Sequence, residues 1–438
     1  MNTLCGKISL CLSTYRESRA AIKRQFRPDE IIEIQNRKLA KLMIYCYNNI
    51  KYYREIFEKA GIKPDKNTGL ETLVKVPFLT KEDLRRRYWD FFPVKLPECR
   101  VERTSGSTGT PLCIFSDRNS RRFNSAAVIR CRQALGIGLI GRSILTPLST
   151  VNEPYRKSHW TFLQGIHKTY YVNPYIESCD NIQYANQLLS RMRKPALIGN
   201  MSAIKALAYR IKDGVFPYFE TYIILTMSES LSPEDRYLLE DTFKCKVADI
   251  YACSEAGDIA WQCIDGSGYH INADNIVIEI VNDDKIVGPN ESGEVVITNL
   301  NRYAMPIIRY KNGDIARLKS DLCLCGRKLP MMAEIIGRMS EDLSIPNGKV
   351  VPWKQVRDMM VHPLVRQYQF LQNPKGDLTI RYTTDLATER DSIEETLLRR
   401  CQNLFGYSIR IKFEKTNSIS PTTGGKSRFI IADYKASI

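Results

Sequence analysis

The segment Arg103-Thr104-Ser105-Gly106-Ser107-Thr108-Gly109-Thr110-Pro111 gathers hydroxyl groups and glycines into one short loop. Glycine lets the backbone curl tightly and approach a ligand closely. Successive backbone N–H groups in such a loop form a concavity that holds anions, and the hydroxyl groups add further donors. The segment lacks the Gly-Lys-Ser/Thr ending of a Walker loop. It therefore indicates a phosphate-binding loop of another kind, and an ordinary Ser/Gly surface loop is the alternative interpretation.

Three later segments carry residue types that suit a nucleotide. Asp249-Ile250-Tyr251-Ala252-Cys253-Ser254-Glu255 ends a predicted strand with a ring that can stack and a carboxylate that can hold Mg²⁺. In Ile308–Asp314, the carboxylate of Asp314 follows a glycine turn and can accept two hydrogen bonds from a ribose diol. Gly424-Gly425-Lys426-Ser427-Arg428 places a lysine on a glycine-rich turn, within reach of an anion. Taken singly, the ordinary interpretations are a strand-end tyrosine, a turn aspartate and a basic tail.

The predicted elements begin with helices and continue as a mixture of strands and helices. Pro28 opens a long periodic stretch that runs to a stop at Gly61, and Thr80 begins a capping-box sequence with Asp83. From about Val101 the chain becomes α/β. Strands at Tyr222–Thr226 and Lys246–Tyr251 flank a helix at Leu231–Phe243, with Ser232 as its cap and Pro233 at its first position. This spacing predicts a parallel pair of strands.

The last third of the chain changes character twice. Ile276–Val281 and Glu294–Thr298 predict an antiparallel pair joined by a polar connection. From about Met339 the pattern predicts a separate α+β module of roughly 100 residues, large enough to fold alone. Its predicted elements are two hairpin strands, a helix and a third strand, at Tyr368–Leu371, Leu378–Tyr382, Ser392–Leu404 and Ile409–Phe413.

Composition narrows the class of protein. Of the 438 residues, 43% are hydrophobic and 26% are charged, as in ordinary globular chains. No apolar run is long enough for a transmembrane helix, and Ile8–Ser13 is too short and polar for a secretory signal core. The net charge of +16 suits nucleic acid, an anionic membrane surface or small polyanions. The 13 cysteines show no disulfide framework, which indicates reduced thiols and a cytoplasmic location.

The four nucleotide-suited segments, in this order and spacing, resemble the adenylate-forming acyl/aryl-CoA ligase superfamily, which includes firefly luciferase and the adenylation domains of peptide synthetases. Within it the chain is similar to the phenylacetate–CoA ligase branch and its relatives found near capsular-polysaccharide genes. Val76–Leu84 matches the "P-x-L-T-K-x-x-L" element of that branch, and Ile336-Gly337-Arg338 resembles the Gly-Arg before its hinge. The resemblance covers about residues 40 to 430.

The resemblance implies the architecture. The expected fold class is α/β, and a large multi-subdomain adenylate-forming N-terminal body would span residues 1–338, of which about 1–100 would be helical. A small mobile α+β C-terminal domain would span residues 339–438. In this family the C-terminal domain rotates between two half-reactions.

The resemblance also implies roles for particular residues. The phosphate loop would hold the β- and γ-phosphates with Ser105, Gly106, Ser107, Thr108, Gly109 and Thr110. Tyr251 would lie against the adenine with Ser254 in the same nucleotide-binding set, and Asp314 would hold the ribose with Arg338 nearby. The catalytic residues would be Glu255, as the Mg²⁺ ligand, and Lys426, which would bridge the attacking carboxylate and the α-phosphate.

The implied activity is an AMP-forming ligase that uses Mg·ATP to convert a carboxylic acid, by family default an aryl acid, into an acyl-adenylate. Coenzyme A would then accept the acyl group. The alternative is transfer of the acyl group or of AMP to an amine or another acceptor, without coenzyme A. A nucleic-acid or membrane-surface binder is a third hypothesis, but no nucleic-acid-binding motif is visible, so no nucleic-acid partner is expected. A homodimer is only a base-rate expectation.

The chain departs from the family pattern at three places. Thr110 stands where many relatives carry lysine, which would remove one phosphate contact. The hinge of relatives reads Gly-Arg-x-Asp-Asp, whereas this chain has Gly337-Arg338-Met339-Ser340-Glu341-Asp342. The last motif, Pro421–Lys426, lacks the arginine often seen after proline.

A second constellation suits a metal ion. Cys263 and His270 lie upstream of a Cys323-Leu324-Cys325 pair. Three sulfurs and one imidazole suit tetrahedral zinc in a closed, structural site. Some phenylacetate–CoA ligase-like proteins carry a similar set, and reduced core cysteines are the alternative. Trp160, Tyr170 and Tyr171 form an aromatic stretch, for which a hydrophobic core is a safer interpretation than an acyl pocket.

Overall fold

The computed structural model describes residues 4–103, 112–148, 156–176, 178–266, 268–338, 342–362, 364–384, 390–417, 419, 429–432 and 434. The helices are α1 (Leu4–Arg24), α2 (Pro28–Asn49), α3 (Lys51–Lys59), α4 (Leu70–Leu73), α5 (Lys81–Arg86), α6 (Arg118–Ala134), α7 (Cys179–Leu189), α8 (Met201–Lys212), α9 (Pro233–Phe243), α10 (Trp353–Met359) and α11 (Arg390–Phe405), with a 3-10 helix at Tyr88–Phe91.

The strands follow the same numbering along the chain. They are β1 (Cys99–Arg103), β2 (Cys113–Asp117), β3 (Ile144–Pro147), β4 (His159–Thr161), β5 (His167–Val172), β6 (Ala196–Asn200), β7 (Ile223–Met227), β8 (Val247–Cys253), β9 (Gly257–Gln262), β10 (Tyr269–Ile271), β11 (Ile276–Asn282), β12 (Lys285–Ile286), β13 (Ser292–Asn299), β14 (Tyr310–Lys319), β15 (Met331–Arg338), β16 (Leu343–Ser344), β17 (Val350–Val351), β18 (Val365–Gln372), β19 (Leu378–Thr384), β20 (Ile411–Lys415) and β21 (Ile430–Ala432).

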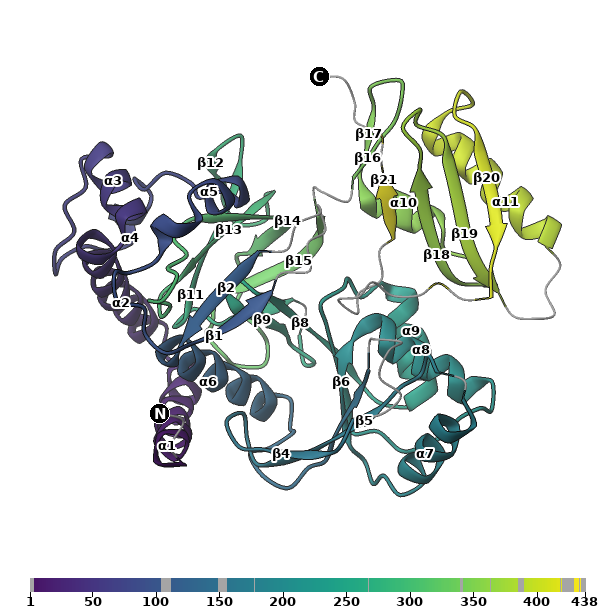
Figure 1. Ribbon diagram of the computed structural model, residues 1–438, viewed down its shortest axis with the longest axis horizontal. Helices are drawn as coiled ribbons and strands as arrows, with labels where there is room; N and C mark the ends of the chain where they lie inside the picture. Colours follow the sequence, from purple (N-terminus) through teal and green to yellow (C-terminus); the bar gives the residue numbers. More distant parts are fainter. Residues whose placement is uncertain are drawn as a thin grey trace.

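The body is built on a continuous 13-stranded sheet in the order β12-β11-β13-β14-β15-β10-β9-β8-β7-β6-β3-β5-β4. Neighbouring strands from β8 to β5 pair in parallel, and α8 and α9 pack on this part of the sheet (Figure 1). The predicted parallel pair is confirmed as β7 and β8, joined through α9. The Ser232 hydroxyl caps that helix by accepting from the backbone N–H of Asp235, as expected from the Ser-Pro start.

The antiparallel half of the sheet also follows the sequence pattern. Strands β11 and β13 pair antiparallel, with Ile276 opposite Asn299. The predicted capping box at α5 is present, because Thr80 and Asp83 exchange side-chain-to-backbone hydrogen bonds. The alternation of strands and helices thus gives the α/β class that the sequence predicts.

The single helix predicted from Pro28 to Gly61 is wrong, because the chain forms α2 and α3 with a break at Ile50. The backbone of Ile50 is extended, with φ −117° and ψ 113°, and its side chain is fully buried. The bend lets Tyr52 stack on Phe91, with ring centroids 4.2 Å apart. Tertiary packing therefore overrides a helical periodicity that continues through the break.

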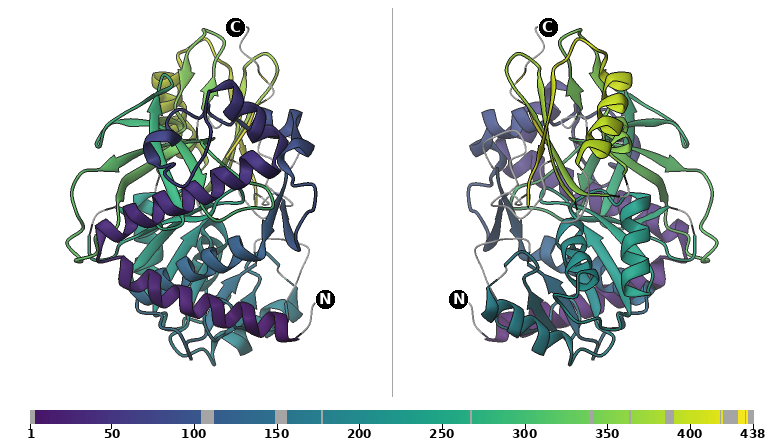
Figure 2. Two further views of the ribbon diagram at one scale, coloured as in Figure 1. Left: turned by 90° about the vertical axis from the view of Figure 1, so that its left-hand side faces the viewer. Right: turned by 90° about the vertical axis from the view of Figure 1, so that its right-hand side faces the viewer.

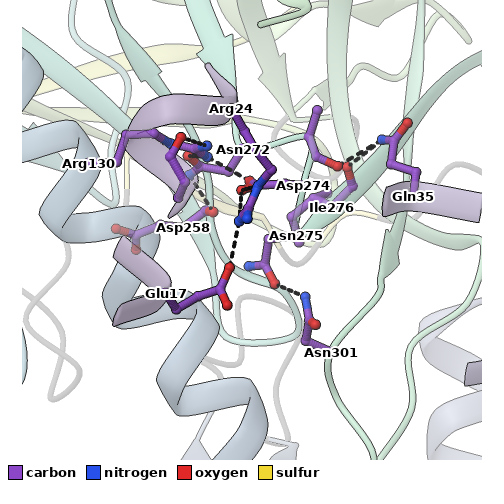
Figure 3. A network of polar contacts seen from close by, with 12 residues as sticks. Glu17, Arg24, Gln35, Arg130, Asp258, Asn272, Asp274, Asn275, Ile276 and Asn301 are labelled. Carbon is purple, nitrogen blue, oxygen red and sulfur yellow. Dashed lines mark hydrogen bonds and ion pairs between the residues drawn. The ribbon is translucent and has the colours of Figure 1, made fainter. Parts of the chain in front are cut away.

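A buried polar network fixes the N-terminal helices to the body. Arg24 of α1 and Arg130 of α6 each donate to the Asp274 carboxylate at 2.9 Å (Figure 3). Lys38 of α2 donates to the Asp274 backbone oxygen. Burial raises the pKa of Asp274, but the surrounding cations outweigh it and hold that pKa below its usual value. The left view of Figure 2 shows the purple helices lying across this side of the body.

The C-terminal module has a four-stranded sheet in the order β20-β19-β18-β21 and a core of its own, which includes Phe370, Tyr382 and Leu397. The predicted hairpin is confirmed as β18 and β19, which pair antiparallel. Both Nη atoms of Arg366 in β18 donate to the Asp213 carboxylate at 2.7 Å, next to the end of α8. The boundary expected at residues 338/339 remains a prediction, and residues 339–341 lie outside the described residues.

The aromatic stretch around β4 and β5 is only partly core. Tyr171 is buried, as expected, but the Trp160 side chain is 54% exposed on β4, the last strand at one edge of the sheet. The core interpretation is therefore wrong for Trp160, because an edge strand has no further strand to cover it. No helix in the described part of the chain is long and apolar enough to cross a membrane.

Candidate nucleotide-binding site and metal centre

The proposed phosphate loop lies between two paired strands. Strand β1 pairs antiparallel with β2, so that Arg103 stands opposite Cys113 at the point where the loop leaves and returns. The loop residues Ser105, Gly106, Ser107, Thr108, Gly109 and Thr110, together with Lys426, lie outside the described residues. The described part of the site is therefore built by β8, β14 and β15.

Three residues predicted from separate motifs meet, because two of them contact the carboxylate of the third. The Tyr251 hydroxyl donates to Asp314 Oδ2 at 2.7 Å, and Arg338 Nε donates to Asp314 Oδ1 at 2.6 Å. The second contact follows from register, because Asp314 of β14 stands directly opposite Arg338 of β15. Burial, together with the neighbouring Asp314, raises the pKa of Tyr251 well above its ordinary value.

Asn312 completes this cluster, and the sequence analysis missed it. Its Nδ2 donates at 2.7 Å both to the Tyr251 hydroxyl and to Asp314 Oδ2. A carboxylate offers about four acceptor positions. Three of them are engaged by Tyr251, Asn312 and Arg338, so Asp314 retains capacity for a ligand hydroxyl. Asn312 lies two residues from Asp314, and its position on the same turn was the available signal.

Glu255 lies next to this cluster on the segment that follows β8. Its carboxylate is buried and accepts a hydrogen bond from the Tyr310 hydroxyl at 3.2 Å. The preceding Ser254 carbonyl accepts from Arg302 Nη2 at 3.2 Å, which fixes the backbone on which Glu255 stands. A single carboxylate held in this way can serve as a Mg²⁺ ligand when substrate phosphates supply the other oxygens.

Two cations near Glu255 were also missed by the sequence analysis. Arg302 is buried, and burial lowers its pKa although nearby acids, including Glu255, oppose that shift. Burial likewise lowers the pKa of Lys81, against the opposing field of Glu255. The hydrogen bond from the Leu79 N–H to the Arg309 carbonyl at 2.8 Å ties the Lys81 segment to the start of β14. Glu255 therefore has two cations in its surroundings, and these would help to hold a polyanionic substrate.

The four predicted metal ligands form one cluster. The ligand atoms of Cys263, His270, Cys323 and Cys325 all lie within 4.8 Å of one another, and Cys325 Sγ is 3.3 Å from His270 Nε2. A Cβ built on Gly266 would stand 2.6 Å from Cys323 Sγ, so glycine is needed for the loop to pass this close. Three thiolates and one imidazole form the donor set of a closed tetrahedral zinc site, so the residues present fit zinc.

The metal-ligand cluster and the nucleotide cluster stand at opposite ends of one hairpin. The turn between β14 and β15 carries Cys323 and Cys325, beyond the pair of Lys319 with Met331. The other end of the same hairpin carries Asp314 and Arg338. Five residues of strand span roughly 17 Å, so the two clusters are separate.

The chain is similar in structure to solved CoA ligases. A crystal structure of 2-hydroxyisobutyryl-CoA ligase in the postadenylation state superimposes with a TM-score of 0.73 at 20% identity, and covers 90% of this chain and 88% of that chain. The fold is therefore that of adenylate-forming CoA ligases. No protein-family model matches the chain.

The relatives found by sequence similarity indicate one branch of this class. The phenylacetate-coenzyme A ligase of Thermus thermophilus is 25% identical over 92% of this chain and 96% of its own length. Protein CapK of Staphylococcus aureus is 23% identical over 99% of this chain and 96% of its own length. The resemblance to the phenylacetate–CoA ligase branch and its capsule-associated relatives, inferred from the motifs, is confirmed over nearly the whole chain.

Proposed function

We propose that this protein is an AMP-forming ligase that activates a carboxylic acid with Mg·ATP and then transfers the acyl group to coenzyme A. The observation that carries this proposal is the convergence of Tyr251, Asp314 and Arg338 on β8, β14 and β15 of an adenylate-forming fold. The relatives support this class of enzyme, since they include phenylacetate-coenzyme A ligases.

In the first half-reaction, a carboxylate oxygen of the acid forms a bond to the α-phosphorus of ATP, and the bond to pyrophosphate breaks. Asp314 would hold the ribose hydroxyls, Tyr251 would lie against the adenine, and the Ser105–Thr110 loop would hold the departing phosphates. Lys426 would stabilise the charge that develops at the α-phosphate. Mg²⁺, which Glu255 would hold, neutralises phosphate charge when it is bound.

In the second half-reaction, the thiol of coenzyme A would attack the acyl carbonyl, and AMP would leave with the electrons of the carbonyl–oxygen bond. The altered hinge sequence Met339-Ser340-Glu341 and the similarity to CapK favour keeping one alternative. In that alternative an amine or another acceptor receives the acyl group or AMP. Trapping with hydroxylamine separates acyl transfer from AMP transfer, because an acyl-adenylate gives a hydroxamate whereas transferred AMP does not. Thioester formation then separates coenzyme A from an amine as the acceptor of the acyl group.

ATP–pyrophosphate exchange against aryl, fatty, amino and sugar acids tests the adenylation step. We expect exchange with one acid class, with aryl acids as the first candidate. Absence of exchange across the panel, in protein that binds ATP, would contradict formation of an acyl-adenylate from these acids. Thioester formation with coenzyme A and the active acid then tests the second step.

We further propose that Cys263, His270, Cys323 and Cys325 hold a structural zinc ion. A zinc ion there would cross-link the segment that follows β9 to the turn between β14 and β15. Its role would be structural. The support is the shared cluster of ligand atoms and the glycine required beside Cys323. This site would act on stability, because a closed four-ligand set leaves no position for a substrate.

Replacing Cys263 with serine is expected to remove bound zinc and to lower the unfolding temperature by roughly 5–10 °C. Metal content measured by mass spectrometry and thermal unfolding check both effects. Cys179→Ser is the matched control, because Cys179 is exposed and lies outside the cluster. Purified protein without zinc, or equal destabilisation by both variants, would show that the cluster is a set of reduced core cysteines.

We also propose a cellular location and an oligomeric state for the protein. We place the reaction in the cytoplasm, where ATP and coenzyme A are available and thiols stay reduced. A homodimer is the commonest oligomer for such chains, and size-exclusion chromatography with light scattering tests it.

A further inference from the structure

One side of α1 presents an unusual stripe to solvent. Ile8, Leu12, Arg16, Arg19 and Lys23 recur at helical spacing, and all five are exposed. The Ile8 side chain is 50% exposed and the Leu12 side chain 66%. We call these five residues the outer stripe. Two large apolar side chains thus stand in line with three cations, and the stripe contains no acidic residue.

The opposite side of α1 is firmly attached, so the outer stripe has a fixed orientation. Leu10, Thr14 and Ala21 are buried on that side, where α1 packs against α6. Arg24, in the last turn, donates to the buried Asp274 carboxylate at 2.9 Å (Figure 3). Ile8 and Leu12 therefore face away from the packed side of α1 and do not belong to the core of the body.

Strand β4 extends the same surface. Trp160 and Phe162 are each 54% exposed, and residues two apart along an extended segment share a side. The Tyr15 hydroxyl of α1 donates to the carbonyl of Phe162, the residue directly after β4, which joins α1 to this segment. Figure 1 shows α1 and β4 along the same lower edge of the molecule. Four large apolar side chains and three cations therefore belong to one surface.

We propose that the outer stripe of α1, together with Trp160 and Phe162, docks the protein on an anionic lipid bilayer. A basic amphipathic helix with leucine and nearby aromatic side chains has the chemistry of an element that lies in the membrane interface. Tryptophan prefers the headgroup level. Arg16, Arg19 and Lys23 supply the attraction to anionic headgroups, each worth roughly fivefold in affinity.

Charge favours a bilayer over a second copy of this chain. A two-fold symmetric contact places a surface against itself. In a two-fold contact the cations of one outer stripe would face either the cations or the apolar end of the other, and neither stripe offers an acid to balance them. An anionic bilayer offers the opposite charge together with an apolar layer for Leu12 and Trp160.

Sedimentation of the full-length protein with vesicles tests this proposal. Vesicles of phosphatidylcholine with phosphatidylglycerol are compared with vesicles of phosphatidylcholine alone. We expect binding to the anionic vesicles only. Combined Arg16→Gln, Arg19→Gln and Lys23→Gln should weaken this binding by on the order of a hundredfold. Combined Leu12→Ala and Trp160→Ala should weaken it by at least about tenfold.

Control variants remove an equal number of cations and one exposed aromatic side chain elsewhere. Lys59, Lys63 and Lys66, exposed residues of and after α3, are changed together to glutamine, and Tyr407, which is 79% exposed, is changed to alanine. These variants should bind vesicles like the original protein, and thermal unfolding checks that every variant is folded. The proposal is overturned if the original protein ignores anionic vesicles, or if the controls weaken binding as strongly. Loss of a dimer without loss of vesicle binding would assign the surface to a second copy instead.

Discussion

Lys426→Ala is expected to lower the rate of ATP–pyrophosphate exchange by roughly 10²–10³-fold, the usual loss when one group that stabilises transition-state charge is removed. An ammonium group would offset the negative charge that develops as the carboxylate attacks the α-phosphorus. ATP binding should change little, because the proposed ribose and adenine contacts would come from Asp314 and Tyr251 in the body. Exchange kinetics and an ATP-binding isotherm measure the two quantities separately.

A lysine elsewhere in the C-terminal module provides the control for this variant. Lys375→Ala removes an exposed cation from the turn between β18 and β19 and should leave exchange unchanged. Full exchange by Lys426→Ala would refute the assigned role, which rests on the resemblance of the Gly424–Arg428 segment to the family motif. Equal losses in both variants would point to general damage to the module.

Local sequence signals predicted much of the fold and singled out three residues that the structure brings together. The Ser-Pro start of α9 and the capping box at Thr80 are satisfied by neighbouring residues, so short segments contain the whole signal. Tyr251, Asp314 and Arg338 were found because each belongs to a recognisable motif. Their mutual contacts depend on the pairing of β14 with β15, which no single motif contains.

The features that were missed depend on residues far apart in sequence. The break at Ile50 exists because Tyr52 finds Phe91, about forty positions later, and helical periodicity carries no information about that partner. Arg302 acts on the site through the carbonyl of Ser254. The aromatic residues near Trp160 in the sequence are typical of a core, but Trp160 is exposed because β4 is the last strand at the sheet edge. Topology, rather than composition, decides such positions.

Asp314→Asn is expected to raise the KM for ATP by roughly 10–100-fold while kcat changes much less. Loss of the charge would weaken the proposed hydrogen bonds to both ribose hydroxyls, each of which is worth about 1.5–3 kcal/mol when a charged group takes part. These ribose contacts would be the same in the ground state and the transition state, so their loss should appear in KM. Steady-state kinetics at varied ATP, with saturating acid, give the two constants.

Tyr251→Phe is the matched control for the change at Asp314. It removes the hydroxyl that donates to Asp314 Oδ2 but retains the ring proposed to lie against adenine. We expect its KM for ATP to rise by less than about tenfold, because Arg338 and Asn312 still hold the carboxylate. If Asp314→Asn instead lowered kcat with an unchanged KM, the carboxylate would serve the reacting atoms, and the ribose assignment would be wrong. If Tyr251→Phe matched the loss in Asp314→Asn, the tyrosine hydroxyl would be the essential group, with Asp314 as its support.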